Sequence, residues 1–67
     1  MTIIIPAIFN DTEGNLLIFV DDIENVQEVD GVVTIIMKST FEFETTLSLI
    51  EIQKKIEVAN IKQFKFN

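Results

Sequence analysis

The feature that most constrains this chain is its content of β-branched residues, because Ile, Val and Thr number 12, 6 and 6 among 67 residues. Six phenylalanines add to them. β-Branched and aromatic side chains fit a pleated strand surface, and the β-branched ones are restricted in a helix. A chain of this length has the size of one small domain. The sequence therefore predicts a single domain over residues 1–67 that is built mainly from β-strands.

Two apolar runs near the N-terminus predict a first β-hairpin. Residues 3–9 form one strand, and Pro6 restricts that strand to a sheet edge or a bulge because proline cannot donate a ladder hydrogen bond. Residues 10–15 are polar and predict a loop in which Gly14 is available for a positive φ. Residues 16–20 are five consecutive apolar residues, and we expect them to form the partner strand.

A second hairpin is centred on Asp30-Gly31, a dipeptide that is typical of two-residue β-turns. The apolar residues of 23–29 are spaced by three, which fits one helical turn as well as an irregular strand. The hairpin signal favours the strand. Residues 32–37 predict the strand that follows the turn. Residues 41–45 then alternate, so we expect both of their phenylalanines to face the core and both glutamates to face water.

One helix is predicted near the C-terminus. Ser48 and Glu51 form a capping box, and Leu47 and Ile52 occupy the positions of a hydrophobic staple. Asn60 suits a left-handed helix end, so the helix is expected over residues 49–59. The stripe that would dock it on the sheet consists of Leu49, Ile52, Ile56 and Ala59.

These elements together predict an α+β fold. We expect an antiparallel sheet of four to five strands, a curved or partly barrel-like β-meander, with one C-terminal helix at about residues 49–59. A helix of that length does not persist alone in water, so its apolar stripe must pack on the sheet. Residues 61–67 are expected to be either a last strand or a flexible end.

Four features of residues 9–56 match a known pattern. Gly14 lies in the first turn, Val20-Asp21-Asp22-Ile23-Glu24 follows a strand, a β-hairpin comes next, and the helix ends in Ile52-Gln53-Lys54-Lys55-Ile56. On these features the chain resembles the small bacterial swarming-motility and flagellar proteins of the FlbD type, although Lys38-Ser39-Thr40 stands where that family has a second glycine. The strand content is also broadly similar to that of a LytTR-type DNA-binding domain. The first resemblance implies a motility-type regulatory protein, which a gene neighbourhood among flagellar genes would test.

The residue types exclude the conventional catalytic triads. The chain has no His and no Cys, so a Ser or Cys nucleophile would lack its usual activating base. Paired carboxylates at Asp21-Asp22 or at Glu42 and Glu44 are better explained as solvated strand-end and outward-facing acids. Residues 11–15 carry oxygen ligands in the predicted loop, but the spacing of an EF-hand is missing. We therefore expect the protein to be non-enzymatic and to have no cofactor and no metal site.

Charge and the N-terminal sequence restrict the partners. The net charge of −6 opposes binding to nucleic-acid phosphates, so no direct nucleic-acid partner is expected. Residues 1–9 lack the positive segment of a signal peptide and are far shorter than a membrane helix. The sequence predicts a cytoplasmic protein without a membrane partner.

The predicted strands carry more apolar surface than one helix can cover. Both faces are apolar in residues 3–5, 16–20 and 35–37, and soluble monomers rarely leave large apolar patches in water. We therefore expect the sheet to curl and a protein partner to cover the rest. The predicted function is a small non-enzymatic interaction or assembly module that self-associates into a homo-oligomer through a sheet face or an edge strand. The candidate contact residues are Leu17, Phe19, Ile36, Phe64 and Phe66.

An alternative function is that of an acidic inhibitor that mimics nucleic acid, for example a phage-encoded anti-defence protein. Its phosphate surrogates would be Asp21, Asp22, Glu24, Glu28, Glu42 and Glu44. Salt separates the two functions, because a charge-dominated interface weakens steeply as ionic strength rises whereas an apolar interface changes little.

Overall fold

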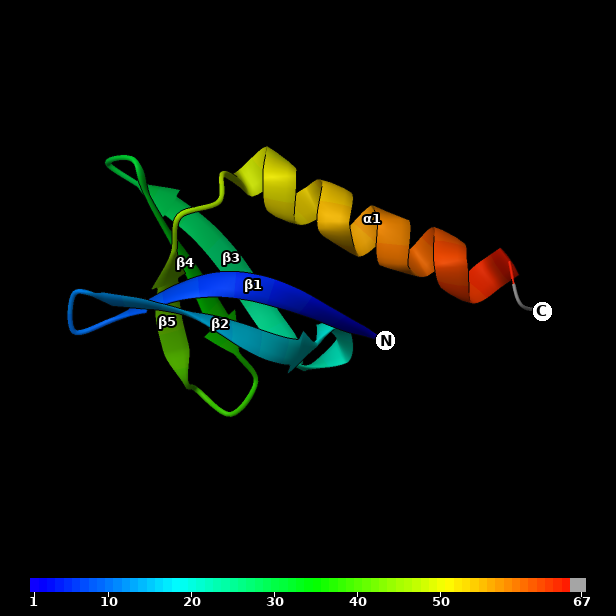
Figure 1. Ribbon diagram of the computed structural model, residues 1–67, viewed down its shortest axis with the longest axis horizontal. Helices are drawn as coiled ribbons and strands as arrows, with labels where there is room; N and C mark the ends of the chain where they lie inside the picture. Colours follow the sequence, from blue (N-terminus) through cyan, green and yellow to red (C-terminus); the bar gives the residue numbers. More distant parts are fainter. Residues whose placement is uncertain (66–67) are drawn as a thin grey trace.

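A computed structural model shows a five-stranded antiparallel sheet with one helix (Figure 1). It describes the backbone of residues 1–65 and the side chains of residues 1–61. The strands are β1 (Thr2–Phe9), β2 (Thr12–Phe19), β3 (Ile23–Val29), β4 (Val32–Met37) and β5 (Glu42–Thr45). A 3-10 turn, η1 (Val20–Asp22), joins β2 to β3, and α1 (Leu49–Lys65) follows β5. The predicted α+β fold with a curved antiparallel sheet and a C-terminal helix is confirmed.

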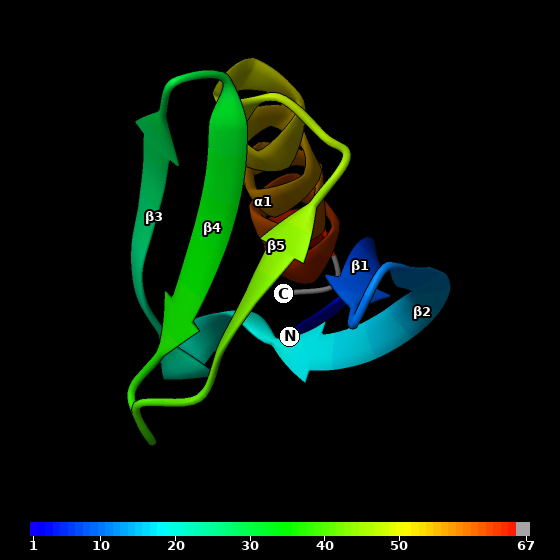
Figure 2. The ribbon, with the colours of Figure 1, turned by 90° about the vertical axis from the view of Figure 1, so that its left-hand side faces the viewer.

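The strand order is β2-β1-β5-β4-β3, so the sheet is not one simple meander. Strand β2 does not pair with β3; β1 pairs with β5 instead, at Ile8 and Glu44. The η1 turn redirects the chain between the two halves, and its Val20 N–H donates to the Met1 carbonyl at 3.0 Å. Figure 2 shows the β1–β2 hairpin running across the direction of β3, β4 and β5. The sheet therefore curls strongly but stays open, with β2 and β3 as its edges.

The first hairpin is tighter than the sequence predicts. Its turn is only Asn10-Asp11, with φ of 48° and 65°, and β2 begins at Thr12. The predicted loop over residues 10–15 is therefore wrong, and Gly14 pairs with Ala7 inside the ladder without a positive φ. Asn and Asp tolerate the left-handed region, which a two-residue hairpin turn requires at both positions.

Pro6 lies in a strand that is internal to the sheet, yet its local environment is that of an edge. Only Ile8 of β1 is in register with β5, so the stretch of β1 around Pro6 pairs with β2 alone, where Asn15 stands opposite Pro6. The missing N–H of proline is tolerated there because β5 does not extend that far.

Strand β3, whose apolar residues are spaced by three, contains a bulge. Met37 pairs with Ile23 and Ile36 pairs with Asn25, so Glu24 is an extra residue in β3. The extra residue places both Ile23 and Val26 against the core although they are three apart. The expected irregular strand is confirmed, and the bulge explains its spacing.

The second hairpin turns at Asp30-Gly31, with φ of 52° and 80°. We expect Gly31→Ala to lower the free energy of unfolding by about 1–2 kcal/mol, because a Cβ in the left-handed region clashes with its own backbone. Gly14→Ala is the matched control, since Gly14 has no positive φ and a Cβ there would meet nothing within 4 Å. Urea unfolding followed by circular dichroism measures both. Equal losses in the two variants would contradict the turn geometry.

The core lies between the inner face of the curled sheet and α1. Helix α1 contacts both β1 and β3, which are far apart in the strand order, so it lies across the open side of the sheet. Thr45 is the one buried polar side chain among the described residues, and its Oγ1 accepts the Leu47 N–H at 3.3 Å. The buried apolar residues are Ile3, Ile5, Ala7, Ile18, Val33, Ile35, Phe43 and Ile52.

The start of α1 is the one predicted. The Ser48 Oγ accepts the Glu51 N–H at 3.1 Å, and the Glu51 Oε1 accepts the Ser48 N–H at 3.0 Å. Within the predicted stripe, Ile52 is buried and Ile56 and Ala59 pack against the core, while Leu49 is exposed.

The end of α1 differs from the prediction. The helix continues through Asn60 to Lys65, so the expected end at residue 59 is wrong. Residues 61–65 are helical and do not form the last strand, and residues 66 and 67 of the predicted tail lie outside the described residues. Asn60 is half-buried within the helix, and the Lys and Gln residues after it are good helix formers.

Candidate functional site

The outer face of the β1–β2 hairpin carries three large apolar side chains in water. Ile4, Leu17 and Phe19 are 57%, 65% and 59% exposed. Ile4 and Leu17 are direct cross-strand partners, and Phe19 lies two residues further along the same face of β2. We call these three residues the hairpin patch.

Strict alternation produces the hairpin patch. Along β1 the residues Ile3, Ile5 and Ala7 point into the core, so Ile4 between them must point outward. Ile18 on β2 is buried for the same reason, and its neighbours Leu17 and Phe19 face solvent. The apolar runs of the sequence therefore place some of their side chains where α1 cannot cover them.

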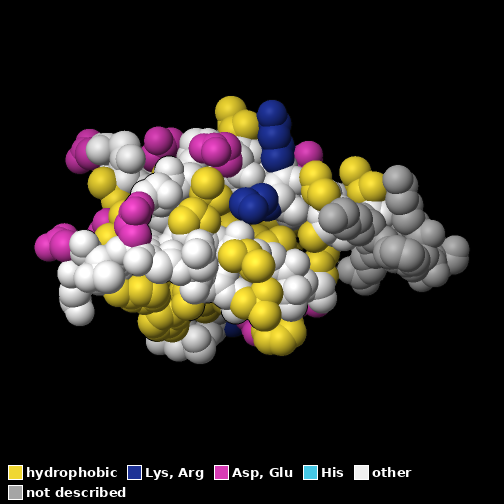
Figure 3. All heavy atoms as spheres, in the orientation of Figure 1, with side chains coloured by type: hydrophobic (Ala, Val, Ile, Leu, Met, Phe, Trp, Pro, Cys, Tyr) yellow, Lys and Arg dark blue, Asp and Glu magenta, His cyan; other side chains and the backbone are white. Residues whose placement is uncertain are grey.

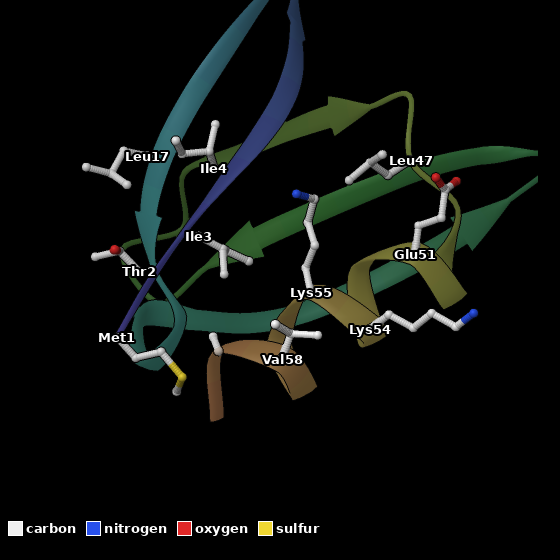
Figure 4. A pocket seen from close by; sticks show the side chains of 11 residues that line it. Met1, Thr2, Ile3, Ile4, Leu17, Leu47, Glu51, Lys54, Lys55 and Val58 are labelled. Carbon is white, nitrogen blue, oxygen red and sulfur yellow. The ribbon is translucent and has the colours of Figure 1, made fainter. Parts of the chain in front are cut away.

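A groove of about 880 Å³ adjoins the hairpin patch and separates the hairpin from α1. Figure 4 shows Ile4 and Leu17 on the strand side, and Glu51, Lys55 and Val58 on the helix side. The full lining is Met1, Thr2, Ile3, Ile4, Leu17, Leu47, Glu51, Lys54, Lys55, Val58 and Ala59. Most of these side chains are apolar, so the groove extends the apolar surface of the hairpin patch up to the two lysines.

The space-filling view shows the same surface from outside. In Figure 3 a strip of hydrophobic side chains runs over the hairpin, directly below a basic side chain. The predicted contact residues Leu17 and Phe19 thus lie together, and Ile4 and Val58 belong to the same surface although they were not predicted. Val58 is an apolar residue of α1 that lies outside the docking stripe. An apolar helix residue in such a position is the sequence signal that could have identified it.

The third predicted contact residue, Ile36, lies on a different part of the sheet. It is half-buried on β4, where its cross-strand neighbours are Asn25 on β3 and Glu42 on β5. Thr34, the next residue on that face, pairs with Gln27 and Glu44. The outer face around Ile36 is polar, and the exposed Val29 and Val32 lie at the far end of β3 and β4, so Ile36 is not part of the hairpin patch.

The two predicted contact residues of the tail, Phe64 and Phe66, cannot be assigned to the hairpin patch. Phe64 lies in the helical backbone of α1, and its side chain is outside the part that the structure describes. Phe66 lies outside the described residues altogether.

The predicted acidic residues are all exposed, but they come from three elements. Asp21 and Asp22 form η1, Glu24 and Glu28 belong to β3, and Glu42 and Glu44 belong to β5. Among the described residues no group of three acidic side chains could hold a metal ion.

Three phenylalanines form an aromatic cluster that the sequence did not reveal. Phe9, Phe41 and Phe43 have ring centroids 5.9 to 6.2 Å apart, at the opposite end of β1 from the hairpin patch. Phe41 precedes β5 and is half exposed, so the expectation that both Phe41 and Phe43 face the core is correct only for Phe43. A left-handed residue at Thr40, with φ of 73°, turns the chain just before Phe41.

Comparison with protein-family models, with curated proteins and with solved structures finds no match for this chain. The resemblance to FlbD-type motility proteins therefore stays a prediction. Within the described part of the chain, no helix has the length and apolar character needed to cross a membrane.

Proposed function

We propose that this protein is a non-enzymatic interaction module that self-associates as a symmetric homodimer through the hairpin patch. The observation that carries the proposal is the exposure of Ile4, Leu17 and Phe19 side by side on one face. Adjacent exposed apolar side chains of this size are typical of protein interfaces, whereas scattered ones are ordinary surface.

The edge position of β2 supports the same surface. No strand pairs with the outer edge of β2 in the part of the chain that the structure describes. Proteins usually protect such edges with Lys, Pro or a bulge, and β2 has neither residue type along Thr12–Phe19. The other edge, β3, carries a bulge at Glu24. The open edge therefore leaves β2, the strand that carries Leu17 and Phe19, accessible to a second copy.

The magnitudes indicate a weak affinity for the hairpin patch alone. Complete burial of a large apolar side chain contributes about 1.5–3 kcal/mol, so each residue of the hairpin patch, a little over half exposed, offers about 1–2 kcal/mol. A symmetric dimer buries six such side chains, which gives about 6–12 kcal/mol against an association cost of about 4–15 kcal/mol. The hairpin patch alone therefore supports only a weak dimer, and its flanking groups decide how stable the dimer is.

Sedimentation of the wild-type chain at several concentrations and two ionic strengths tests the proposal. We expect a monomer–dimer equilibrium in the range of about 1–100 μM, corresponding to roughly 5–8 kcal/mol. The dimer should persist at high salt, weakened only by the screening of its flanking charges, because apolar burial is not screened. A chain that stays monomeric at about 1 mM would overturn the proposed function.

The acidic-inhibitor alternative stays a prediction with its own test. All six acidic residues named for it are exposed and available to a basic partner. Binding to a nucleic-acid-binding enzyme should then fall steeply as ionic strength rises, in contrast to the homodimer.

A further inference from the structure

Oppositely charged groups flank the hairpin patch at its two ends. At one end Lys54 and Lys55 of α1 line the groove across from Ile4 and Leu17, and Figure 4 shows the Lys55 side chain extending toward Ile4 and the Lys54 side chain extending away from it. Glu51 lies at this end as well, where its Oε1 accepts the Ser48 N–H. The two lysines leave this end with a net positive charge.

The acidic end follows directly from the course of β2. After Phe19 the chain enters η1, where Asp21 and Asp22 are exposed. The hydrogen bond from the Val20 N–H to the Met1 carbonyl holds η1 beside the N-terminus of β1. Lys38 lies close by, since its N–H donates to the Asp22 carbonyl at 2.7 Å, and the Met1 amino group is near as well. Asp21, Asp22 and the exposed Glu24 that follows η1 outnumber these two positive groups, so this end is acidic. The order along the surface is therefore lysines, apolar strip, aspartates.

A surface with this order is complementary to itself. In a two-fold symmetric dimer the same patch occurs on both protomers, and a two-fold axis perpendicular to the strip exchanges its two ends. With the axis near Leu17, the basic end of each protomer meets the acidic end of the other, and the apolar strips cover each other. The parallel alternative would place like charges together.

We propose that two copies of this chain pair antiparallel across the hairpin patch, with Lys54 and Lys55 of each protomer facing Asp21 and Asp22 of the other. The inference rests on the proposed homodimer and specifies its orientation. A second copy is the occupant that the charges favour, because an unrelated acidic partner would match the lysine end only. The arrangement also explains how two chains that each carry a charge of −6 can associate despite their mutual repulsion.

Charge reversal with complementation tests the arrangement. Lys54→Glu/Lys55→Glu places like charges in both contacts of its homodimer, and Asp21→Lys/Asp22→Lys does the same with the opposite sign. Because each of the two symmetric contacts changes from attraction to repulsion, we expect each variant alone to dimerise at least about tenfold more weakly than the wild type. In an equimolar mixture both contacts of the heterodimer join opposite charges, so the affinity should return to within about threefold of wild type.

Glu42→Lys/Glu44→Lys changes the net charge by the same amount as the aspartate variant, but on the outer face of β5, and it should not complement Lys54→Glu/Lys55→Glu. All of these positions are exposed, and circular dichroism checks that every variant is folded. Variants that dimerise like the wild type, or a mixture that fails to restore dimerisation, would overturn the antiparallel arrangement while the homodimer itself stands. A monomeric wild type would overturn the proposed function as well.

Discussion

Replacing Leu17 with Glu is expected to leave the chain monomeric at concentrations where the wild type is a dimer. Leu17 is 65% exposed and lies opposite Ile4 at the centre of the hairpin patch. In a symmetric interface the substitution removes two apolar contacts and brings two carboxylates into a surface that excludes water. The combined loss exceeds about 3 kcal/mol, so dimerisation should weaken at least about 100-fold in sedimentation equilibrium.

Two further variants test whether the loss of dimerisation depends on the sign of the new charge and on its position. Leu17→Lys carries the opposite charge and should also be monomeric if apolar burial is responsible. Ile50→Glu is the matched control, because Ile50 is as exposed as Leu17 but belongs to α1 and does not line the groove. If Ile50→Glu abolished dimerisation and Leu17→Glu did not, the interface would lie on the helix and the proposed hairpin patch would be wrong.

Replacing Ile52 with Ala is expected to cause the largest loss of stability among the helix variants. Ile52 is 2% exposed and is the member of the buried core that α1 contributes. Removing a buried Ile side chain costs about 2–5 kcal/mol, and a 67-residue domain has only about 3–10 kcal/mol in total. Because α1 does not persist in water without its docking contacts, the helix should lose structure along with the core. Urea unfolding followed by circular dichroism measures the change.

Ile50 provides the control within the same helix. It has the same side chain two residues away, but it is 64% exposed. Ile50→Ala should change the free energy of unfolding by less than about 0.5 kcal/mol. Similar losses for Ile50→Ala and Ile52→Ala would mean that α1 does not dock through Ile52, and the position of the helix across the open side of the sheet would have to be abandoned.

Local signals in the sequence predicted several elements correctly. Asp30-Gly31 identified the second hairpin because its residues must adopt positive φ, and that requirement does not depend on the rest of the fold. Ser48 and Glu51 identified the start of α1 because both capping hydrogen bonds lie within one turn of chain. The exposed position of Leu17 and Phe19 was anticipated from an apolar run with side chains on both faces.

The errors arose where distant contacts decide the local structure. Pairing of β2 with β1 from Phe19 back to Thr12 extends the strand through the polar residues 12–15, so the expected loop shrinks to Asn10-Asp11. Phe41 alternates correctly with Phe43, but it precedes β5 and stays half exposed in the aromatic cluster. The local sequence pattern predicts neither the extension of β2 nor the exposure of Phe41.

The sequence by itself determined the fold class, the two hairpins and the start of the helix, because turn conformation, capping and strand alternation depend on neighbouring residues. It also determined that apolar side chains would remain outside the core. Only the tertiary structure decided where they gather. The pairing of β1 with β5 and the placement of α1 across the curled sheet cover the inner faces, while the outer face of the β1–β2 hairpin stays in water. That pairing joins segments far apart in the chain, so no local pattern could show that Ile4, Leu17 and Phe19 would lie between two lysines and two aspartates.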